Sequence, residues 1–251
     1  MKISTGAEFY DNDEAFLAYT KRRQQKENAN DTIEKPAILQ LLGDVTDANV
    51  LDLGCGNAGF GAELLEQGCF SYTGVDGSIN MINAAQQQLS NYPNARVLHE
   101  SMEHYTPPRT EYDLVTARLS LHYMEDLASI FTKVNQALKP EGRFIFSVEH
   151  PVITSTLQPS ALRTNWTVDN YFSMGFRQQH WMGGYVQKYH RTLEEYFSLM
   201  QQSGFTVTNL KEACPQQEHF DNVETYERRM RIPLFLLMSG VKNRKSKEIE
   251  T

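Results

Sequence analysis

A glycine-rich turn carries the residues with the clearest chemical potential in this sequence. The turn 54–59 directly follows the apolar run 50–53, and it contains Gly54, Cys55 and Gly56. Glycine adopts positive φ and lets a ligand approach the backbone without meeting a Cβ. A buried strand that leads into such a turn, and then into a helix, predicts a cofactor-binding site.

Two carboxylates indicate which ligand the turn binds. Asp52 lies two residues before Gly54, where a negative charge suits an ammonium group and repels a pyrophosphate. Asp76 ends the next apolar run, where a carboxylate can accept hydrogen bonds from both ribose hydroxyls. S-adenosylmethionine has an ammonium group and an adenosine but no phosphate, so the pair favours this cofactor. An NAD(P)-dependent oxidoreductase is the alternative, because the glycine spacing alone also fits a dinucleotide.

The elements that position these residues follow from alternating apolar runs and helical stretches. This alternation predicts an α/β fold, with a Rossmann-like, seven-stranded, mostly parallel sheet and helices on both faces. The expected strands are residues 50–53, 71–75, 96–99, 114–117, 143–148, 205–210 and 232–238. The expected helices are residues 14–26, 32–42, 60–67, 78–90, 126–138 and 192–203.

Four motifs of the chain resemble a known family when they are taken in order. They are VLDLGCGNAG, GVDGSINMINAA, YDLVTARLSLHY and LKPEGRFIFSVEHP, and they cover about residues 50–151. The sequence is similar to class I S-adenosylmethionine-dependent methyltransferases, specifically the ubiquinone/menaquinone-type and small-molecule group. The resemblance implies that the last strand of the sheet is antiparallel and that the cofactor lies across the carboxyl ends of the strands.

The resemblance also implies roles for individual residues at the cofactor. Asp52 and Gly54 would hold the methionine moiety, Gly56 would approach the sulfonium, and Asp76 would bind the ribose. The residues expected to flank the adenosine are Gly77, Ser78 and Met81.

Further cofactor contacts are expected from three other segments. Ser101 and Met102 occupy the turn where the family usually has an acidic residue that binds adenine, so an ordinary loop is the alternative there. Arg118 follows the fourth strand and can pair with the cofactor carboxylate or with an acidic acceptor. Tyr10 and Tyr19 belong to an N-terminal segment that closes over the methionine end in related enzymes; core packing is the alternative for them.

The acceptor side of the site is expected in the aromatic-rich segment 150–191. Residues 177–189 predict a β-hairpin around Gly183–Gly184 that folds over the cofactor. Methyl transfer is an in-line displacement that needs no metal and no covalent nucleophile, and it needs a base only if the acceptor must lose a proton. The candidate bases are His150, His180 and His190. The alternative is that this segment only covers an edge of the sheet.

Charge and composition favour a small-molecule acceptor. The formal net charge of -7 disfavours a nucleic-acid partner. The sequence has no apolar run that approaches the roughly 20 residues of a membrane span and no signal-peptide pattern, so a cytoplasmic protein without a membrane partner is expected. A methyltransferase that acts on RNA or protein, and a non-catalytic protein that binds S-adenosylmethionine, remain the alternatives.

The chain length favours one methyltransferase domain over residues 1–251. Within it we expect an N-terminal helical cap at 1–45, a cofactor-binding core at 46–149, a lid at 150–191 and the rest of the sheet at 192–240. The three cysteines are widely spaced and suggest neither a disulfide framework nor a zinc site.

Overall fold

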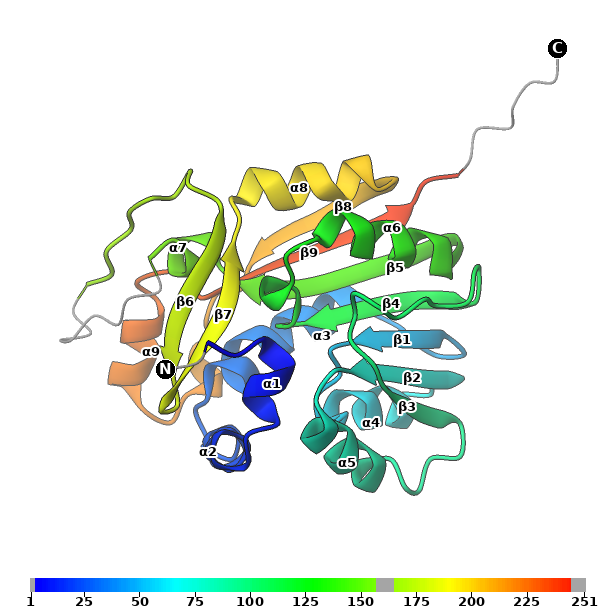
Figure 1. The fold of residues 1–251 in the computed structure, drawn as a ribbon, viewed down its shortest axis with the longest axis horizontal. Helices are drawn as coiled ribbons and strands as arrows, with labels where there is room; N and C mark the ends of the chain where they lie inside the picture. Colours follow the sequence, from blue (N-terminus) through cyan, green and yellow to red (C-terminus); the bar gives the residue numbers. More distant parts are fainter. Residues whose placement is uncertain (1–2, 157–164, 245–251) are drawn as a thin grey trace, which may run out of the picture.

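The computed structural model describes residues 3–156 and 165–244, and a seven-stranded sheet forms its centre (Figure 1). The strand order is β3-β2-β1-β4-β5-β9-β8. Neighbouring strands from β3 to β5 are parallel, whereas β9 is antiparallel to both β5 and β8. The strands are β1 (Asn49–Leu53), β2 (Ser71–Asp76), β3 (Ala95–His99), β4 (Tyr112–Arg118), β5 (Leu138–Glu149), β8 (Phe205–Glu212) and β9 (Phe235–Lys242). The predicted fold class is confirmed.

Helices cover both faces of the sheet because successive strand residues point to opposite sides. Leu51, Phe144 and Phe146 pack in one cluster with α6 (Leu127–Ala137) and α8 (Leu193–Gln202). Val50 and Ile145 pack on the other face in a cluster that includes α3 (Lys35–Leu42), α4 (Gly59–Glu66) and α5 (Ile79–Gln88). The apolar runs of the strands are therefore buried on both sides, as in other parallel sheets.

A cap lies beyond the carboxyl ends of the parallel strands (Figure 1). It consists of α1 (Gly6–Tyr10), α2 (Asp13–Arg23) and a hairpin formed by β6 (Gly175–Trp181) and β7 (Gly184–His190). Ser4 joins the N-terminus to β7, since its amide donates to the carbonyl of Tyr185 at 3.1 Å. The N-terminal helices and the hairpin thus form one layer over the edge of the sheet where parallel sheets bind ligands.

The hairpin turn differs by one residue from its predicted position. Met182 and Gly183 both have positive φ, 45° and 83°, and Gly184 already pairs with Trp181 as the first residue of β7. Two successive residues with positive φ make a tight two-residue turn that matches the twist of the strands. Residues 157–164 of the predicted lid lie outside the described residues.

Short elements complete the connections. They are the π-helical turn η1 (Asn30–Glu34), the 3-10 turns η2 (Leu121–Tyr123) and η3 (Gln217–His219), and the helices α7 (Pro151–Thr154) and α9 (Val223–Arg229). Within the described residues, the helices are too short or too polar to cross a membrane.

Candidate functional site

The glycine-rich turn after β1 has the backbone that its sequence predicts. Gly54 and Gly56 have φ values of 73° and 56°. A Cβ built on Gly54 would lie 2.4 Å from the Cβ of Ser120, and the hydroxyl of Ser120 donates to the carbonyl of Leu53 at 2.8 Å. The turn is therefore packed against the loop that follows β4, and glycine at position 54 is required by both conformation and space.

Asp52 lies beneath this turn and connects three strands. Its carboxylate is 2% exposed, and its two oxygens accept hydrogen bonds from the hydroxyls of Tyr72 (2.8 Å) and Thr116 (2.9 Å). Burial raises the pKa of Asp52, although these hydrogen bonds act in the opposite direction. Because each carboxylate oxygen can accept a second hydrogen bond, the expected contact with the cofactor ammonium stays a prediction.

Asp76 ends β2 and holds the two segments expected around the adenosine. Its oxygens accept hydrogen bonds from the amides of Gly56 and Ser78, both at 2.9 Å. Burial raises its pKa, while the two amide hydrogen bonds lower it. The hydroxyl of Ser78 also caps α5 by accepting from the amide of Met81. One carboxylate thus fixes the glycine-rich turn relative to the start of α5.

The residues predicted at the adenine converge on the same place. The Sδ of Met81 lies 3.9 Å from a Cβ built on Gly56, and the Cε of Met102 lies 3.4 Å from one built on Gly54. Gly77 lies against Ser101, whose hydroxyl is hydrogen-bonded to the ring of His104 at 3.0 Å. The buried thiol of Cys55 packs against Gly74, so the absence of a side chain at Gly74 makes room for it.

Arg118 has a protein partner where a cofactor carboxylate was predicted. Its guanidinium donates to both carboxylate oxygens of Glu34, at 3.2 and 2.5 Å, and lies over the ring of Phe60. Glu34 is fully buried and also accepts from the hydroxyl of Ser147 at 2.6 Å. Burial lowers the pKa of Arg118, but the neighbouring carboxylate of Glu34 raises it by more. The ion pair with Glu34 therefore holds Arg118 and the loop after β4 in place, so the guanidinium already has a carboxylate partner in the structure.

Three tyrosines lie together, two from the cap helices α1 and α2 and one from η2. The hydroxyls of Tyr10 and Tyr123 are 3.3 Å apart, and the ring of Tyr10 lies 5.0 Å from that of Tyr19. Burial raises the pKa of both Tyr10 and Tyr19, and the nearby charge of Asp76 adds to the effect on Tyr19. The expected contact of Tyr10 and Tyr19 with the methionine end of the cofactor stays a prediction.

The part of the chain that matches a known protein family includes the site described above. Residues 21–210, more than half of the chain, match the family model described as a methyltransferase domain. The chain belongs to this methyltransferase family.

Relatives of similar sequence, two of them solved structures, indicate which cofactor this family member uses. A protein from Listeria monocytogenes, described as a candidate S-adenosylmethionine-dependent methyltransferase, is 32% identical with a TM-score of 0.77, over 84% of this chain and 97% of that chain. An S-adenosylmethionine-dependent methyltransferase from Mesorhizobium loti is 31% identical with a TM-score of 0.76, over 83% and 97% of the two chains. The ubiquinone biosynthesis O-methyltransferase of Serratia proteamaculans is 30% identical over 112 residues, which cover 44% of this chain and 46% of that enzyme. The methyltransferase is dependent on S-adenosylmethionine. The backbone of Gly56, whose amide donates to Asp76, fits that cofactor because a Cβ there would have only Met81 within 4 Å.

Two of the three predicted histidine bases of the methyltransferase are occupied by structural hydrogen bonds. His150 accepts from the amide of Val152 through Nδ1, so its Nε2 donates to Glu212 at 2.9 Å. His190 donates through Nε2 to the carbonyl of Tyr171 at 2.8 Å, so its Nδ1 accepts from the hydroxyl of Thr154 at 2.7 Å.

Burial lowers the pKa of both rings, and neither has a nitrogen free to take a proton from an acceptor. Both rings thus have structural partners, and the role of His150 and His190 as bases stays a prediction. The third candidate, His180, lies exposed on β6 with its ring beside that of Tyr185.

The methyltransferase also contains a buried ion pair that the sequence analysis missed. Glu149, the last residue of β5, accepts from Nζ of Lys188 in β7 at 2.6 Å. The Lys188 side chain is 2% exposed and that of Glu149 is 19% exposed. The two residues are 39 positions apart, so no local pattern joins them; only the fold of the hairpin over β5 brings them together.

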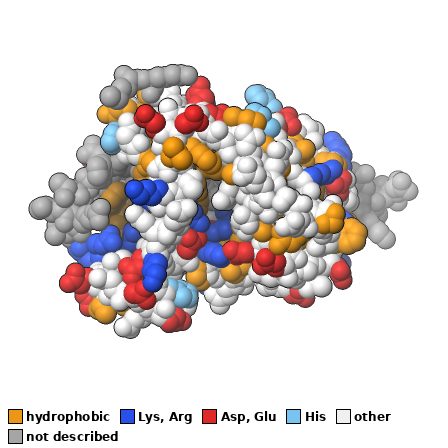
Figure 2. All heavy atoms as spheres, turned by 90° about the horizontal axis from the view of Figure 1, so that it is seen from below, with side chains coloured by type: hydrophobic (Ala, Val, Ile, Leu, Met, Phe, Trp, Pro, Cys, Tyr) orange, Lys and Arg blue, Asp and Glu red, His pale blue; other side chains and the backbone are white. Residues whose placement is uncertain are grey.

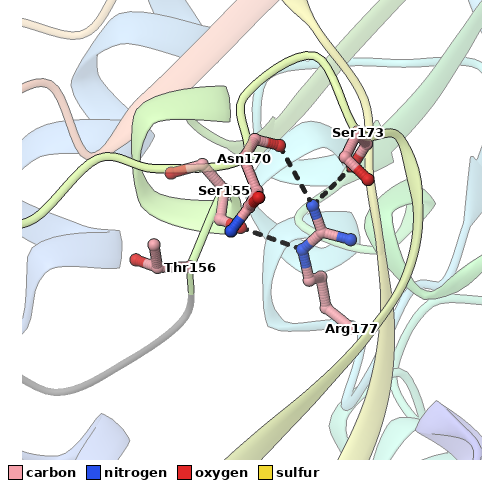
Figure 3. A pocket seen from close by; sticks show the side chains of 5 residues that line it. All are labelled: Ser155, Thr156, Asn170, Ser173 and Arg177. Carbon is pink, nitrogen blue, oxygen red and sulfur yellow. Dashed lines mark hydrogen bonds between the residues drawn. The ribbon is translucent and has the colours of Figure 1, made fainter.

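A separate cavity of about 260 Å³ lies at the start of the hairpin (Figure 3). It is lined by Ser155, Thr156, Asn170, Ser173 and Arg177. Arg177 donates to the carbonyls of Ser155, Asn170 and Ser173, so its guanidinium ties backbone segments together. None of the predicted cofactor residues lines this cavity. Within residues 3–156 and 165–244, no three His, Cys, Asp or Glu side chains form a metal-binding group.

Proposed function

We propose that this methyltransferase transfers the methyl group of S-adenosylmethionine to a small-molecule acceptor by in-line displacement. The observation that carries the proposal is the cap. In the cap, Tyr10 contacts both Tyr19 and Tyr123, and Ser4 joins the N-terminal segment to the hairpin. A site covered in this way suits an acceptor that fits within it, and aromatic walls favour a flat or apolar compound.

The distribution of charge supports a small acceptor over RNA. The net charge is -7, and on the face seen in Figure 2 most basic side chains lie close to acidic ones. Arg118, the basic residue among those predicted to bind the cofactor, is already paired with Glu34. A phosphate backbone would need several unpaired cations along its path.

The chain's own residues contribute position and exclusion of water. The backbone of the turn at Gly54 and Gly56 would hold the methionine half of the cofactor, and Asp76 would hold the ribose. The cofactor supplies an activated methyl group. The three tyrosines would keep water from the sulfonium and hold the acceptor in line with it, which is where most of the rate acceleration of such a reaction can arise.

The proposal is tested with radiolabelled S-adenosylmethionine and a cell extract divided by ultrafiltration. We expect label to be transferred to compounds of the small-molecule fraction and not to the RNA or protein of the retained fraction. With a chiral methyl group, the product is expected to show inversion, because an in-line displacement inverts the carbon.

Transfer into the retained fraction alone would favour an RNA or protein methyltransferase. Retention of configuration would contradict the in-line step. The control is the Gly54→Ala variant, whose cofactor site is impaired. With this variant, transfer of label should fall in whichever fraction is labelled by the native protein.

A further inference from the structure

The pair formed by Glu149 and Lys188 has an unfilled hydrogen-bonding capacity. Oε1 of Glu149 accepts from Lys188, whereas Oε2 is buried and has no hydrogen-bond partner among the described residues. A buried carboxylate oxygen without a partner costs free energy, so native proteins rarely keep one without a function. The Nε1 of Trp181, whose ring lies 5.7 Å from the Lys188 ammonium, is likewise buried without a partner.

This pair lies beside the tyrosines that are proposed to hold the acceptor. The ammonium of Lys188 lies 5.4 Å from the ring centre of Tyr123, whose hydroxyl is 3.3 Å from that of Tyr10. Tyr10 belongs to the part of the cap that lies against the start of α5: its carbonyl accepts from the side-chain amide of Asn80 at 3.2 Å, and the next residue, Asp11, accepts from the hydroxyl of Ser78 at 2.7 Å. Tyr123 and Tyr10 therefore lie between Lys188, the partner of Glu149, and the start of α5, where the predicted ribose carboxylate Asp76 accepts from the amide of Ser78.

The charges around Glu149 restrict what can bind to it. Burial raises the pKa of Glu149, but the ammonium of Lys188 lowers it, with a further contribution from Arg22, so that the pKa lies below its ordinary value and the carboxylate is ionised. Its free oxygen repels a carboxylate ligand. Lys188 and Arg22 repel a protonated amine. A neutral hydroxyl satisfies the carboxylate by donating a hydrogen bond and meets neither repulsion.

We infer that Glu149, oriented by Lys188, accepts a hydrogen bond from the hydroxyl of the methyl acceptor, and that the acceptors are neutral alcohols or phenols. The inference rests on the proposed function and deepens it. In the reaction, the hydroxyl oxygen forms a bond to the methyl carbon while the bond from that carbon to sulfur breaks, and sulfur keeps the electron pair. The hydroxyl proton becomes strongly acidic as the new bond forms and passes to Glu149, which later releases it to solvent.

The test measures binding of three probes to protein saturated with S-adenosylhomocysteine, by ligand-observed NMR. The probes are phenol, benzoate and benzylamine, which share one ring and differ in the charge of their polar group. We expect phenol to bind at least about tenfold more tightly than either charged probe, because one hydrogen bond to a charged group supplies such a factor. Glu149→Gln should remove the preference.

Two further variants show whether a loss of preference comes from Glu149 itself or from destabilisation of the fold. The double variant Glu149→Gln/Lys188→Met removes both charges, so it leaves no unpaired ammonium, and it should also lose the preference for phenol. Asp113→Asn breaks the ion pair with Lys139 at the opposite end of the sheet, and it should keep the preference.

Benzoate or benzylamine binding as tightly as phenol, an unchanged preference in both Glu149 variants, or binding of none of the probes would each overturn the inference. Titration of S-adenosylhomocysteine into the same samples distinguishes failure of the inference about Glu149 from failure of the proposed function. If it binds and the preference is absent, only the inference fails; if it does not bind, the proposed function fails as well.

Discussion

Glu34→Gln is expected to lower the free energy of unfolding by about 3 to 5 kcal/mol, the range for removing one partner of a buried ion pair. Glu34 is fully buried, and its loss leaves the guanidinium of Arg118 with a 15% exposed side chain and no carboxylate. The amide NH2 group of glutamine would face the guanidinium in place of one carboxylate oxygen, and the hydroxyl of Ser147, which donates to Glu34 and accepts from the amide of Leu119, would share the one remaining acceptor oxygen with Arg118. Chemical denaturation of the variant and the native chain measures the difference.

Two control variants show whether burial is the cause. Glu34→Gln/Arg118→Met removes both charges and should recover part of the lost stability, since no unpaired charge stays buried. Glu111→Gln breaks the exposed pair with Arg96 and should cost about 1 kcal/mol or less. If Glu34→Gln lowered the free energy of unfolding by less than about 1 kcal/mol, the pair would contribute no more to stability than an exposed ion pair.

Gly54→Ala is expected to weaken both the fold and the cofactor site. The residue has φ of 73°, which costs an alanine about 1 to 2 kcal/mol. Its new Cβ would also meet the Cβ of Ser120 at 2.4 Å, and overpacking of this kind typically costs a further 1 to 3 kcal/mol. Because the loop around Ser120 must move away from the turn, affinity for S-adenosylhomocysteine should fall by about tenfold or more, a loss of about 1.4 kcal/mol.

Gly43→Ala provides the matched control for this substitution. Gly43 has a similar φ of 58°, but a Cβ there would have nothing within 4 Å. It should show the conformational cost alone and leave cofactor affinity unchanged. Equal losses of stability and of affinity in the two variants would contradict the requirement for space at Gly54.

The fold was predictable because its signals are local. The central strands β1, β4 and β5 each contain a short buried apolar run, and the glycines and Ser78 that follow the strands mark turns and a helix cap. The carboxyl ends of parallel strands meet at one edge, so Asp52 and Asp76 had to lie near the same turn. These inferences depend on spacing along the chain, which the sequence contains directly.

The acceptor side was less predictable because its contacts are distant in sequence. His150 stands at a strand end, where a base was expected, but the following Pro151 begins a helix and His150 caps it. Glu34 shares a helical face with Ile38 and Leu42, and a charge at an apolar position was a signal that a partner existed. No sequence pattern named Arg118 as that partner.

The central claim is tested most directly by calorimetric titration of S-adenosylhomocysteine into the native chain and into Asp76→Ala. We expect the native chain to bind it. The variant should bind about ten- to a hundredfold more weakly, because two hydrogen bonds from ribose to a charged group are lost. NADH should not bind comparably to either protein. Tight binding of NADH without binding of S-adenosylhomocysteine would contradict the account, and unchanged affinity in Asp76→Ala would show that the ribose does not lie at this carboxylate.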